Sequence, residues 1–449
     1  MNQPAHAAES IANEGCRLPA EVVLHAGMYL PTAETWNPFA SAALDFLNTF
    51  SREIKKCGRH LKSPEVMALA FWCRRSHILL LRKKHAGIEL MTRLGRGRIF
   101  HLAPANVPLM FFYTYAIGLL AGNAGIIRIS GRTLRMESTQ AVLKVLRILY
   151  KRKEFSAICS RSCFISYERS DALTEKILRS CDGRVLWGGD ETILRMRRIP
   201  MPAHAVELTF PDRVSLAVID EDALEKMEEE RVRNLVHRFY NDTYAMDQNG
   251  CSSPQTVIWL KKSVPDESGM LRNDPATGDR PDAASESGTQ AASFVRKKWW
   301  EMLAKEAEAS YEIDGFRAAR KLERALLTAM RPVGSDDTAA GESATFRYNR
   351  GNWLYVLHLP ALPADLSGYK GGFGLFYETE TDSVEKIFNS FSQRIQTVVC
   401  IGISPEILSS QAIAQHVPGA LRFVHPGEAL QMDTVWDGTD MIAALSRRM

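Results

Sequence analysis

The longest uncharged stretch of the chain runs from Leu102 to Ile127, 26 residues without Asp, Glu, Lys, Arg or His. One helix of that length could cross a membrane, because about 20 apolar residues are enough. Prolines stand at the front of the stretch, however, and glycines divide its second half. We therefore predict a loop, a helix opened by Pro108 and closed near Gly122, and a buried strand that ends at Ser130. A membrane span is the alternative reading.

Apolar segments of strand and helix type alternate from about residue 97 onward. "RIFHLA", "GIIRIS", "CFISY" and "RVLWGG" have the apolar, β-branched character of buried strands, and amphipathic helical segments separate them. Such alternation predicts a doubly wound parallel sheet. Before it, residues 38–62 and 64–84 carry apolar residues at helical spacing, which predicts a helical N-terminal region.

The pattern changes after residue 204. "HAVELTFPDRVSLAVID" predicts two strands, and a charged helix and the strand "QTVIWLKK" follow. Residues 263–293 and 333–345 contain hardly any large apolar residues, so we predict disordered insertions there. Two helices lie between them, and the first carries the pair Trp299 and Trp300, which we expect to be exposed. A mixed pattern resumes afterwards, so a second α/β domain is expected.

Composition narrows the class of protein. A chain of 449 residues predicts two or more domains. The 56 basic and 52 acidic residues leave a formal charge of +4, too small to indicate a nucleic-acid partner. The first 16 residues lack a basic region followed by an apolar core, so no secretory signal is expected and we predict a cytoplasmic protein. The eight cysteines show no CxxC spacing, which argues against structural zinc and predicts no metal site.

Cys251 differs from the other cysteines in its surroundings. It follows the polar, glycine-containing loop 247–250 and precedes two serines and a proline. Small polar neighbours leave a sulfur approachable, and an amide-lined turn favours the thiolate. Cys251 is thus a candidate nucleophile, and a buried, inert loop thiol is the alternative.

Asn106 is the natural companion of a nucleophile. It lies in "APANVP", where flanking prolines would fix the direction of its side-chain amide. An oxyanion hole requires such a fixed donor, and one donor is worth about 3 kcal/mol in the transition state. A turn-forming Asn is the alternative.

These blocks together resemble the aldehyde dehydrogenase superfamily. "APANVPLMFFYTYAIGLLAGNAGIIRIS" is similar to its oxyanion turn, helix and cofactor strand, and "RVLWGGDETI" to its strand and turn beside the nicotinamide. "WGGDETI" with "FYNDTYAMDQNGCSSPQ" narrows the resemblance to the LuxC-like acyl-CoA reductases, and the tail "GALRFVHPGEALQMDTVWDGTDMI" resembles that family's C-terminal end. The resemblance extends from about Arg98 to the C-terminus, the two insertions excepted.

The resemblance implies a fold and a domain plan. The fold would be α/β and aldehyde-dehydrogenase-like, with a Rossmann-type cofactor domain, an α/β catalytic domain and a small oligomerisation extension. The helical spacing before the cofactor domain 96–206 predicts that residues 1–95 form a helical region packed on it. Residues 207–425 would form the catalytic domain, and 426–449 a C-terminal tail.

The resemblance also implies roles for single residues. Cys251 would take the acyl group from a thioester, and Asn106 with the backbone amide of Cys251 would hold the oxyanion. Seven residues would lie along the cofactor: Arg128, Ser130, Gly131, Arg132, Gly188, Gly189 and Leu208. NAD-preferring relatives carry an acid at the position of Gly131, so its absence here removes a repulsion of the 2′-phosphate and favours NADPH.

Glu207 corresponds to the base that activates water in aldehyde oxidation. A reductase must keep water from its acyl-enzyme, so Glu207 would be a proton donor or a structural group. Two departures from the superfamily weaken the transfer of its role. "LTFP" replaces the diglycine after the glutamate, and "YKGGFGLF" offers no match for the glutamate that contacts the nicotinamide ribose.

The leading hypothesis is an NADPH-dependent acyl-thioester reductase that releases an aldehyde. The resemblance implies an acyl donor, either acyl-CoA or an acyl-protein synthetase that hands over the acyl group, and a homo-oligomer. Two alternatives stay open: an aldehyde dehydrogenase that forms an acid, and a non-catalytic acyl-binding scaffold.

Overall fold

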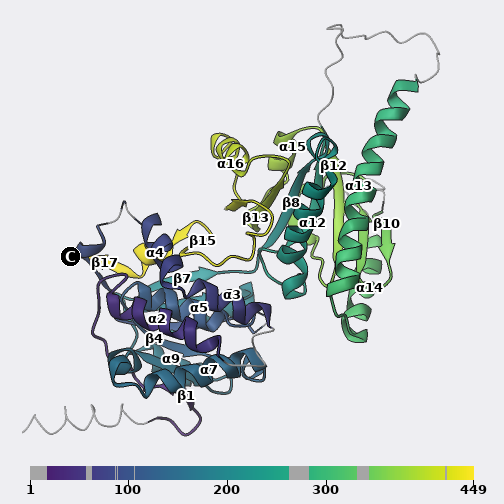
Figure 1. Cartoon of the computed structure of the whole chain (residues 1–449). Helices are drawn as coiled ribbons and strands as arrows, with labels where there is room; N and C mark the ends of the chain where they lie inside the picture. Colours follow the sequence, from purple (N-terminus) through teal and green to yellow (C-terminus); the bar gives the residue numbers. More distant parts are fainter. Residues whose placement is uncertain are drawn as a thin grey trace, which may run out of the picture. The chain divides into compact units, whose positions relative to one another are not determined.

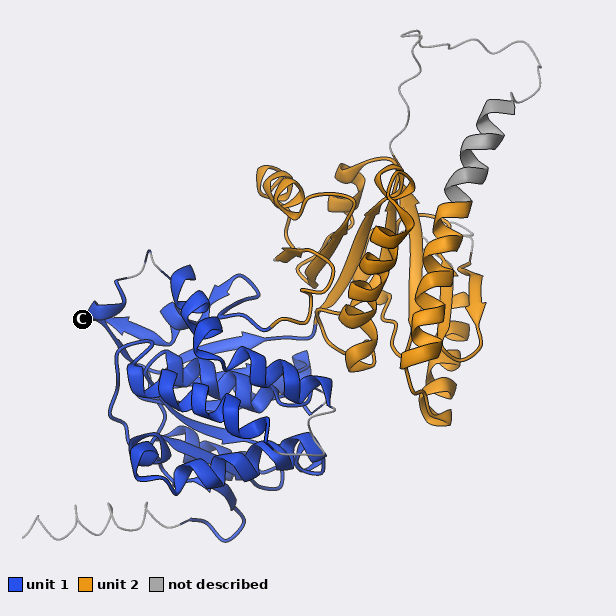
Figure 2. Cartoon of the chain, viewed as in Figure 1, with its two compact units in different colours: residues 1–212, 432–449 blue, residues 213–431 orange. Residues whose placement is uncertain are grey.

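The computed structural model (Figure 1) describes residues 18–56, 63–85, 87, 89–105, 107–261, 283–330, 343–419 and 422–449, and only the backbone of 283–293. Compact units divide the chain in two: Met1–Asp212 with Met432–Met449, and Arg213–Gln431 (Figure 2).

A six-stranded sheet forms the centre of the first unit. Its order is β1 (Val23–Gly27), β5 (Ser162–Ser166), β4 (Ala124–Arg128), β3 (Arg98–Leu102), β6 (Gly183–Trp187) and β7 (Val206–Phe210). All neighbours pair in parallel except β1 with β5. The alternation of apolar strands and helices therefore predicted the sheet type correctly, apart from its antiparallel edge strand.

Helices cover both faces of this sheet because successive strand residues point to opposite sides. Ile99 and Val185 join a core with α2 (Ser41–Ile54), α3 (Pro64–Trp72), α4 (Arg75–Lys84), α5 (Met110–Leu120) and α7 (Glu137–Tyr150). Phe100 and Leu186 join another core with α9 (Asp171–Leu178) and α10 (Asp190–Arg197). The short helices α6 (Gly131–Leu134), α8 (Ser156–Cys159) and α17 (Met441–Ala444) complete the set.

The uncharged stretch at 102–127 is interior sequence. It contains the end of β3, the almost fully buried helix α5 and most of β4, as predicted. None of the described helices combines the length and the apolar character that membrane crossing requires.

The C-terminal residues pack in the first unit. Strand β17 (Ser446–Arg448) pairs antiparallel with β2 (Arg93–Gly95), and β15 (Val435–Trp436) pairs with β16 (Thr439–Asp440). The unit boundaries thus differ from the predicted domains. The first unit extends to Asp212 because β7 pairs with β6. It also includes residues 432–449, which belong to the predicted C-terminal tail.

The second unit has a seven-stranded sheet. Its order is β10 (Thr345–Arg350), β11 (Leu354–His358), β12 (Leu375–Thr381), β9 (Pro254–Leu260), β8 (Val214–Asp220), β13 (Ile395–Ile401) and β14 (Arg422–Val424). Only the β10–β11 pair is antiparallel. The second α/β domain expected from the sequence is therefore present.

Helices again cover both faces. One core contains residues of α12 (Glu229–Thr243) and α13 (Ala283–Ser310), and the other contains residues of α15 (Val384–Asn389) and α16 (Pro405–Ala414). Two further helices are α11 (Glu221–Glu225) and α14 (Gly315–Ala329). The predicted insertions lie mostly outside the described residues, but the described parts differ from the prediction. The backbone is helical from Ala283, and β10 begins at Thr345.

The expectation of exposed tryptophans on α13 is wrong. Trp299 and Trp300 are 0% and 1% exposed. Trp299 packs against Phe239 of α12, and the Trp300 indole N–H donates to Oε2 of the buried Glu378 at 2.7 Å. Both indoles therefore have partners that are distant in sequence.

Candidate functional site

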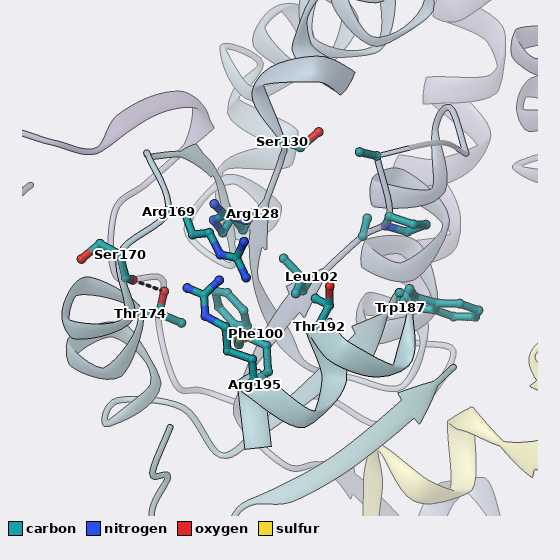
Figure 3. A pocket seen from close by; sticks show the side chains of 16 residues that line it. Phe100, Leu102, Arg128, Ser130, Arg169, Ser170, Thr174, Trp187, Thr192 and Arg195 are labelled. Atoms are coloured by element: carbon teal, nitrogen blue, oxygen red, sulfur yellow. Dashed lines mark hydrogen bonds between the residues drawn. The ribbon is translucent and has the colours of Figure 1, made fainter. Parts of the chain in front are cut away.

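A pocket of about 320 Å³ opens at the carboxyl ends of the strands of the first unit (Figure 3). The chain leaves β3 toward β4 on one side and later returns to β6 on the other, so β3 and β6 flank a topological switch point. Ligands of open α/β sheets bind at such points. The wall combines residues that follow β3, β4, β5 and β6: Phe100, Leu102, Ala103, Pro104, Ala105, Arg128, Ser130, Arg169, Ser170, Thr174, Trp187, Gly188, Gly189, Thr192, Arg195 and Met196.

Gly188 and Gly189 leave room in this wall. A Cβ on Gly189 would meet no atom within 4 Å, and one on Gly188 would approach only Thr192, at 3.6 Å. Packing within the protein therefore does not require glycine at either position. Open space above a strand-to-helix turn is suited to a ligand that approaches the backbone closely.

Three arginines line the same pocket, and Figure 3 shows them on the side opposite Trp187. Arg128 is half-buried, its guanidinium lies 4.6 Å from the ring centre of Tyr167, and its Nε is buried without a hydrogen-bond acceptor. Arg195 forms an ion pair with Asp171, whereas Arg169 has no polar partner among the described residues. Such an excess of guanidinium groups favours a phosphate-bearing ligand.

The structure brings only part of the predicted cofactor set together. Arg128, Ser130, Gly188 and Gly189 line the pocket, and the Ser130 hydroxyl caps α6 by accepting the Thr133 backbone N–H at 3.1 Å. The other three predicted residues do not line it. Gly131 and Arg132 belong to α6, and Leu208 packs against the hydrophobic core from β7. Sequence reasoning missed Arg169, which follows β5, and Arg195, which lies on α10. The sequence blocks that resemble the superfamily include neither residue.

Glu207 lies on β7 between two arginines. Its Oε2 accepts from Arg184 Nε at 2.7 Å and Nη2 at 2.6 Å, and its Oε1 accepts from Arg197 Nε at 2.7 Å. Arg184 stands opposite Glu207 in the strand register and also donates to the Met196 and Ile199 carbonyls. This arrangement ties β7 to β6 and α10, which is a structural role. The catalytic role considered for Glu207 stays a prediction.

Cys251 lies in the second unit, in the turn between α12 and β9. A 3₁₀ helix (Tyr244–Met246) ends at Asp247 and Gln248, which both adopt left-handed conformations with φ of 55° and 58°. Cys251 is half-buried, and its carbonyl accepts from the Ser215 hydroxyl at 2.7 Å. Asn106, its predicted companion, is outside the described residues.

Two buried glutamines hold this turn in place. Gln248 Oε1 accepts the backbone N–H groups of Gly372 and Gly374, at 3.1 and 3.2 Å, and its Nε2 donates to the Pro254 carbonyl. Gln255 Nε2 donates to the carbonyls of Gln248 and Ser253. Sequence reasoning missed both. The sequence signal that could have found Gln248 and Gln255 is their position on either side of Cys251 in "DQNGCSSPQ".

The other described cysteines are poor nucleophiles. Burial raises the thiol pKa of Cys163, Cys181 and Cys400 to about 12 and also raises the thiol pKa of Cys73 and Cys159. Raised values lower the thiolate fraction near neutral pH. Among the described cysteines, only Cys159 shares the partial exposure of Cys251, and Cys159 lies on the short helix α8 rather than in a polar turn.

Comparisons with known proteins agree with these features. Residues 76–268 match the family model described as acyl-CoA reductase (LuxC), and this range includes β3 to β7 as well as Cys251. A long-chain acyl-protein thioester reductase from Vibrio harveyi is 30% identical over 167 residues, which are 36% of this chain and 32% of the relative. The alignment thus spans about one third of that relative's length.

Solved structures share the fold at low sequence identity. Thermus thermophilus 1-pyrroline-5-carboxylate dehydrogenase matches with a TM-score of 0.56 and 11% identity over 100% of this chain and 97% of that chain. A benzaldehyde dehydrogenase from Corynebacterium glutamicum, described as NAD-dependent, gives 0.51 and 12% over 91% and 84%. Bradyrhizobium japonicum proline utilization A gives 0.54 and 13% over 90% of this chain and only 41% of that longer chain. The resemblance found in the sequence is therefore confirmed: the chain has an aldehyde-dehydrogenase-like fold, and its residues 76–268 are similar to the LuxC acyl-CoA reductases.

Proposed function

We propose that this chain is an NADPH-dependent reductase of acyl thioesters that works through an acyl-enzyme on Cys251. The observation that carries the proposal is the extent of the family match. A single matched segment, 76–268, contains both the strands that form the arginine-lined pocket and the half-buried thiol of Cys251.

The pocket residues fit a nicotinamide dinucleotide phosphate. Gly188 and Gly189 would let the nicotinamide riboside approach the backbone, because their missing side chains leave open space. Arg128 would hold the adenosine end, where its buried Nε lacks an acceptor. Arg169 and Arg195 supply further positive charge in the same pocket, which favours NADPH over NADH. Gly131 adds no acid that would repel a 2′-phosphate.

Cys251 would perform the acyl transfer. Its thiolate forms a bond to the thioester carbonyl carbon, and the original carbon–sulfur bond then breaks, releasing CoA or a carrier thiolate that takes up a proton. Asn106 and the Cys251 backbone amide would donate to the oxyanion. When bound, NADPH supplies the hydride that reduces the acyl carbon. The Cys251 sulfur then leaves the same carbon as a thiolate, so one aldehyde forms per NADPH and the enzyme is restored.

The ion pairs of Glu207 support this direction over aldehyde oxidation. A general base must be free to take a proton from water, but both carboxylate oxygens of Glu207 accept from guanidinium groups. The acyl donor that we propose is a long-chain acyl-protein or acyl-CoA, on the name of the Vibrio relative. A homo-oligomer is a further expectation, which light scattering of the purified protein would test.

Aldehyde formation tests the proposal. Purified protein is incubated with long-chain acyl-CoA and either NADPH or NADH, and both cofactor oxidation and aldehyde are measured. We expect equal amounts of aldehyde and NADP⁺, and no turnover by Cys251→Ala. Cys400→Ala, which changes a buried thiol of the same unit, is the matched control and should keep activity. NADP⁺-dependent oxidation of an added aldehyde to acid, without thioester reduction, would refute the proposal.

A further inference from the structure

Asp242 is a buried carboxylate of the second unit that the proposed chemistry does not use. It lies near the end of α12 and is 1% exposed. Its Oδ2 accepts the backbone N–H of Gly427 at 2.6 Å, and its Oδ1 accepts that of Ala429 at 3.0 Å. Both oxygens are thus directed at one turn of the chain, residues 425–431, which we name the strap.

The opposite side of the strap faces a cation. Arg422 donates to three of its carbonyls, those of Glu428, Ala429 and Gln431, at 3.3 to 3.4 Å. The amide end of the turn therefore meets a carboxylate and its carbonyl end meets a guanidinium. This arrangement matches the dipole of the turn at both ends.

The strap also approaches α12 closely. Gly427 has a φ of +90°, and a Cβ there would lie 3.3 Å from Arg238 Cβ. A side chain at this position would be strained by its backbone conformation and would crowd the helix. The glycine thus lets the strap lie flat enough on α12 for both N–H groups to reach Asp242.

Leu430 connects the strap to the reactive turn. A Cβ built on Gly250 would lie 3.2 Å from Leu430 Cδ2, so this methyl group packs directly against the residue that precedes Cys251. The strap therefore packs against the turn that carries the thiol. Its position depends on the hydrogen bonds to Asp242, which is 185 residues away in the sequence.

We infer that Asp242 is a positioning residue for Cys251: by holding the strap, it keeps Leu430 against Gly250 and fixes the turn that presents the thiol. The inference rests on the proposed function only in taking Cys251 as the nucleophile. Its test therefore begins with measurements that need no turnover.

Burial gives the contact a pH dependence. It raises the pKa of the Asp242 carboxyl to about 7. The nearby Glu428 also raises this pKa, whereas the two backbone amides and Arg422 lower it. Arg238 of the same helix and His425 at the start of the strap are the other charged or titratable groups near the turn. Opening the strap would hydrate the carboxyl and lower its pKa. Asp242 therefore stabilises the closed strap most at about pH 4 and below, and this contribution is lost as the pH rises from about 4 to about 7.

Hydrogen–deuterium exchange tests the contact in the full chain. In Asp242→Asn, which removes one acceptor, the peptides covering 425–431 and 247–253 should exchange about tenfold faster, while the strands of the first unit keep their rates. Corrected for intrinsic rates, strap exchange in the wild type should rise between about pH 4 and about pH 7 and level off above it, and in Asp242→Asn it should not. Glu230→Gln, an exposed acid on the same helix, is the matched control.

Alkylation of Cys251 by iodoacetamide tests the consequence. We expect Asp242→Asn to react about fivefold faster, because the turn that carries the thiol loses its support from the strap. Leu430→Ala should show the same acceleration with unchanged exchange of the strap amides, and it serves as the test if Asp242→Asn does not fold. With substrate, kcat should fall about tenfold while the KM for NADPH stays within about twofold. The inference would be overturned if Asp242→Asn loosened the strap without changing the alkylation rate of Cys251, or if Leu430→Ala left that rate unchanged. Either result would count even if the protein proved to be an active reductase.

Discussion

Replacing Glu207 by Gln separates a structural role from a catalytic one. The substitution removes the negative charge between Arg184 and Arg197 while it keeps the size of the side chain. The Arg184 side chain is 7% exposed and that of Glu207 is 24% exposed, so this pair is largely buried, whereas Arg197 is open to solvent. Losing the negative charge is therefore expected to destabilise mainly the buried Arg184.

The magnitude follows from burial. Removing one partner of a fully buried ion pair costs about 3–5 kcal/mol. Glu207 is partly hydrated and Arg184 keeps its two carbonyl acceptors, so we expect about 2–3 kcal/mol. For a unit of this size, that loss lowers Tm by about 5–10 °C.

Thermal unfolding and activity of the same preparation provide the assay. Glu175→Gln is the matched control, because Glu175 pairs with Arg179 on the exposed face of α9 and should cost only about 0.3–0.5 kcal/mol. Well below its Tm, Glu207→Gln should keep its thioester reduction within about fivefold of the wild type. An unchanged Tm with a loss of activity of about 100-fold or more, as expected for a general acid or base, would refute the reasoning.

Two further predictions concern the first unit. Arg169→Ala should lower kcat/KM for NADPH by about 10- to 100-fold and leave kcat/KM for NADH nearly unchanged, because a charge-assisted hydrogen bond to phosphate is worth about 1.5–3 kcal/mol. Arg198→Ala, outside the pocket, is the control. An equal loss with both cofactors would contradict the prediction. His101 should make the unit sensitive to acid, because burial lowers the pKa of its imidazole to about 3. On acidification the unfolded chain therefore binds the proton first, and the folded state loses stability as the pH falls below 6.5. Between pH 7.5 and 5 the loss attributable to this histidine is about 2 kcal/mol; urea unfolding should show it in the wild type and not in His101→Gln, and equal pH dependence in both would refute it.

The sequence predicted those features that local patterns encode. Uninterrupted apolar runs separated by helices predicted the parallel sheets, and prolines and glycines predicted the bounds of α5 and β4. The glycine pair after β6 and Arg128 at the end of β4 also follow directly from strand positions, and all three residues line the pocket. These residues are close in space because parallel strands end at one edge of a sheet.

The remaining features depend on contacts between distant residues. Nothing near Trp299 and Trp300 in the sequence indicates that Phe239 and Glu378 will receive them. Arg169 and Arg195 reach the pocket only because β5 and β6 are placed on opposite sides of β3 and β4. Glu207 looked available for catalysis, and only the register of β6 with β7 revealed Arg184 opposite it.

Intact-mass spectrometry can detect the proposed acyl-enzyme on Cys251 itself. The wild type and Cys251→Ala are incubated with a series of acyl-CoAs, and NADPH is then added. We expect a mass increase of one acyl group on the wild type alone, and its disappearance with release of one aldehyde after NADPH is added. An adduct that persists with NADPH, or that forms equally on Cys251→Ala, would contradict it.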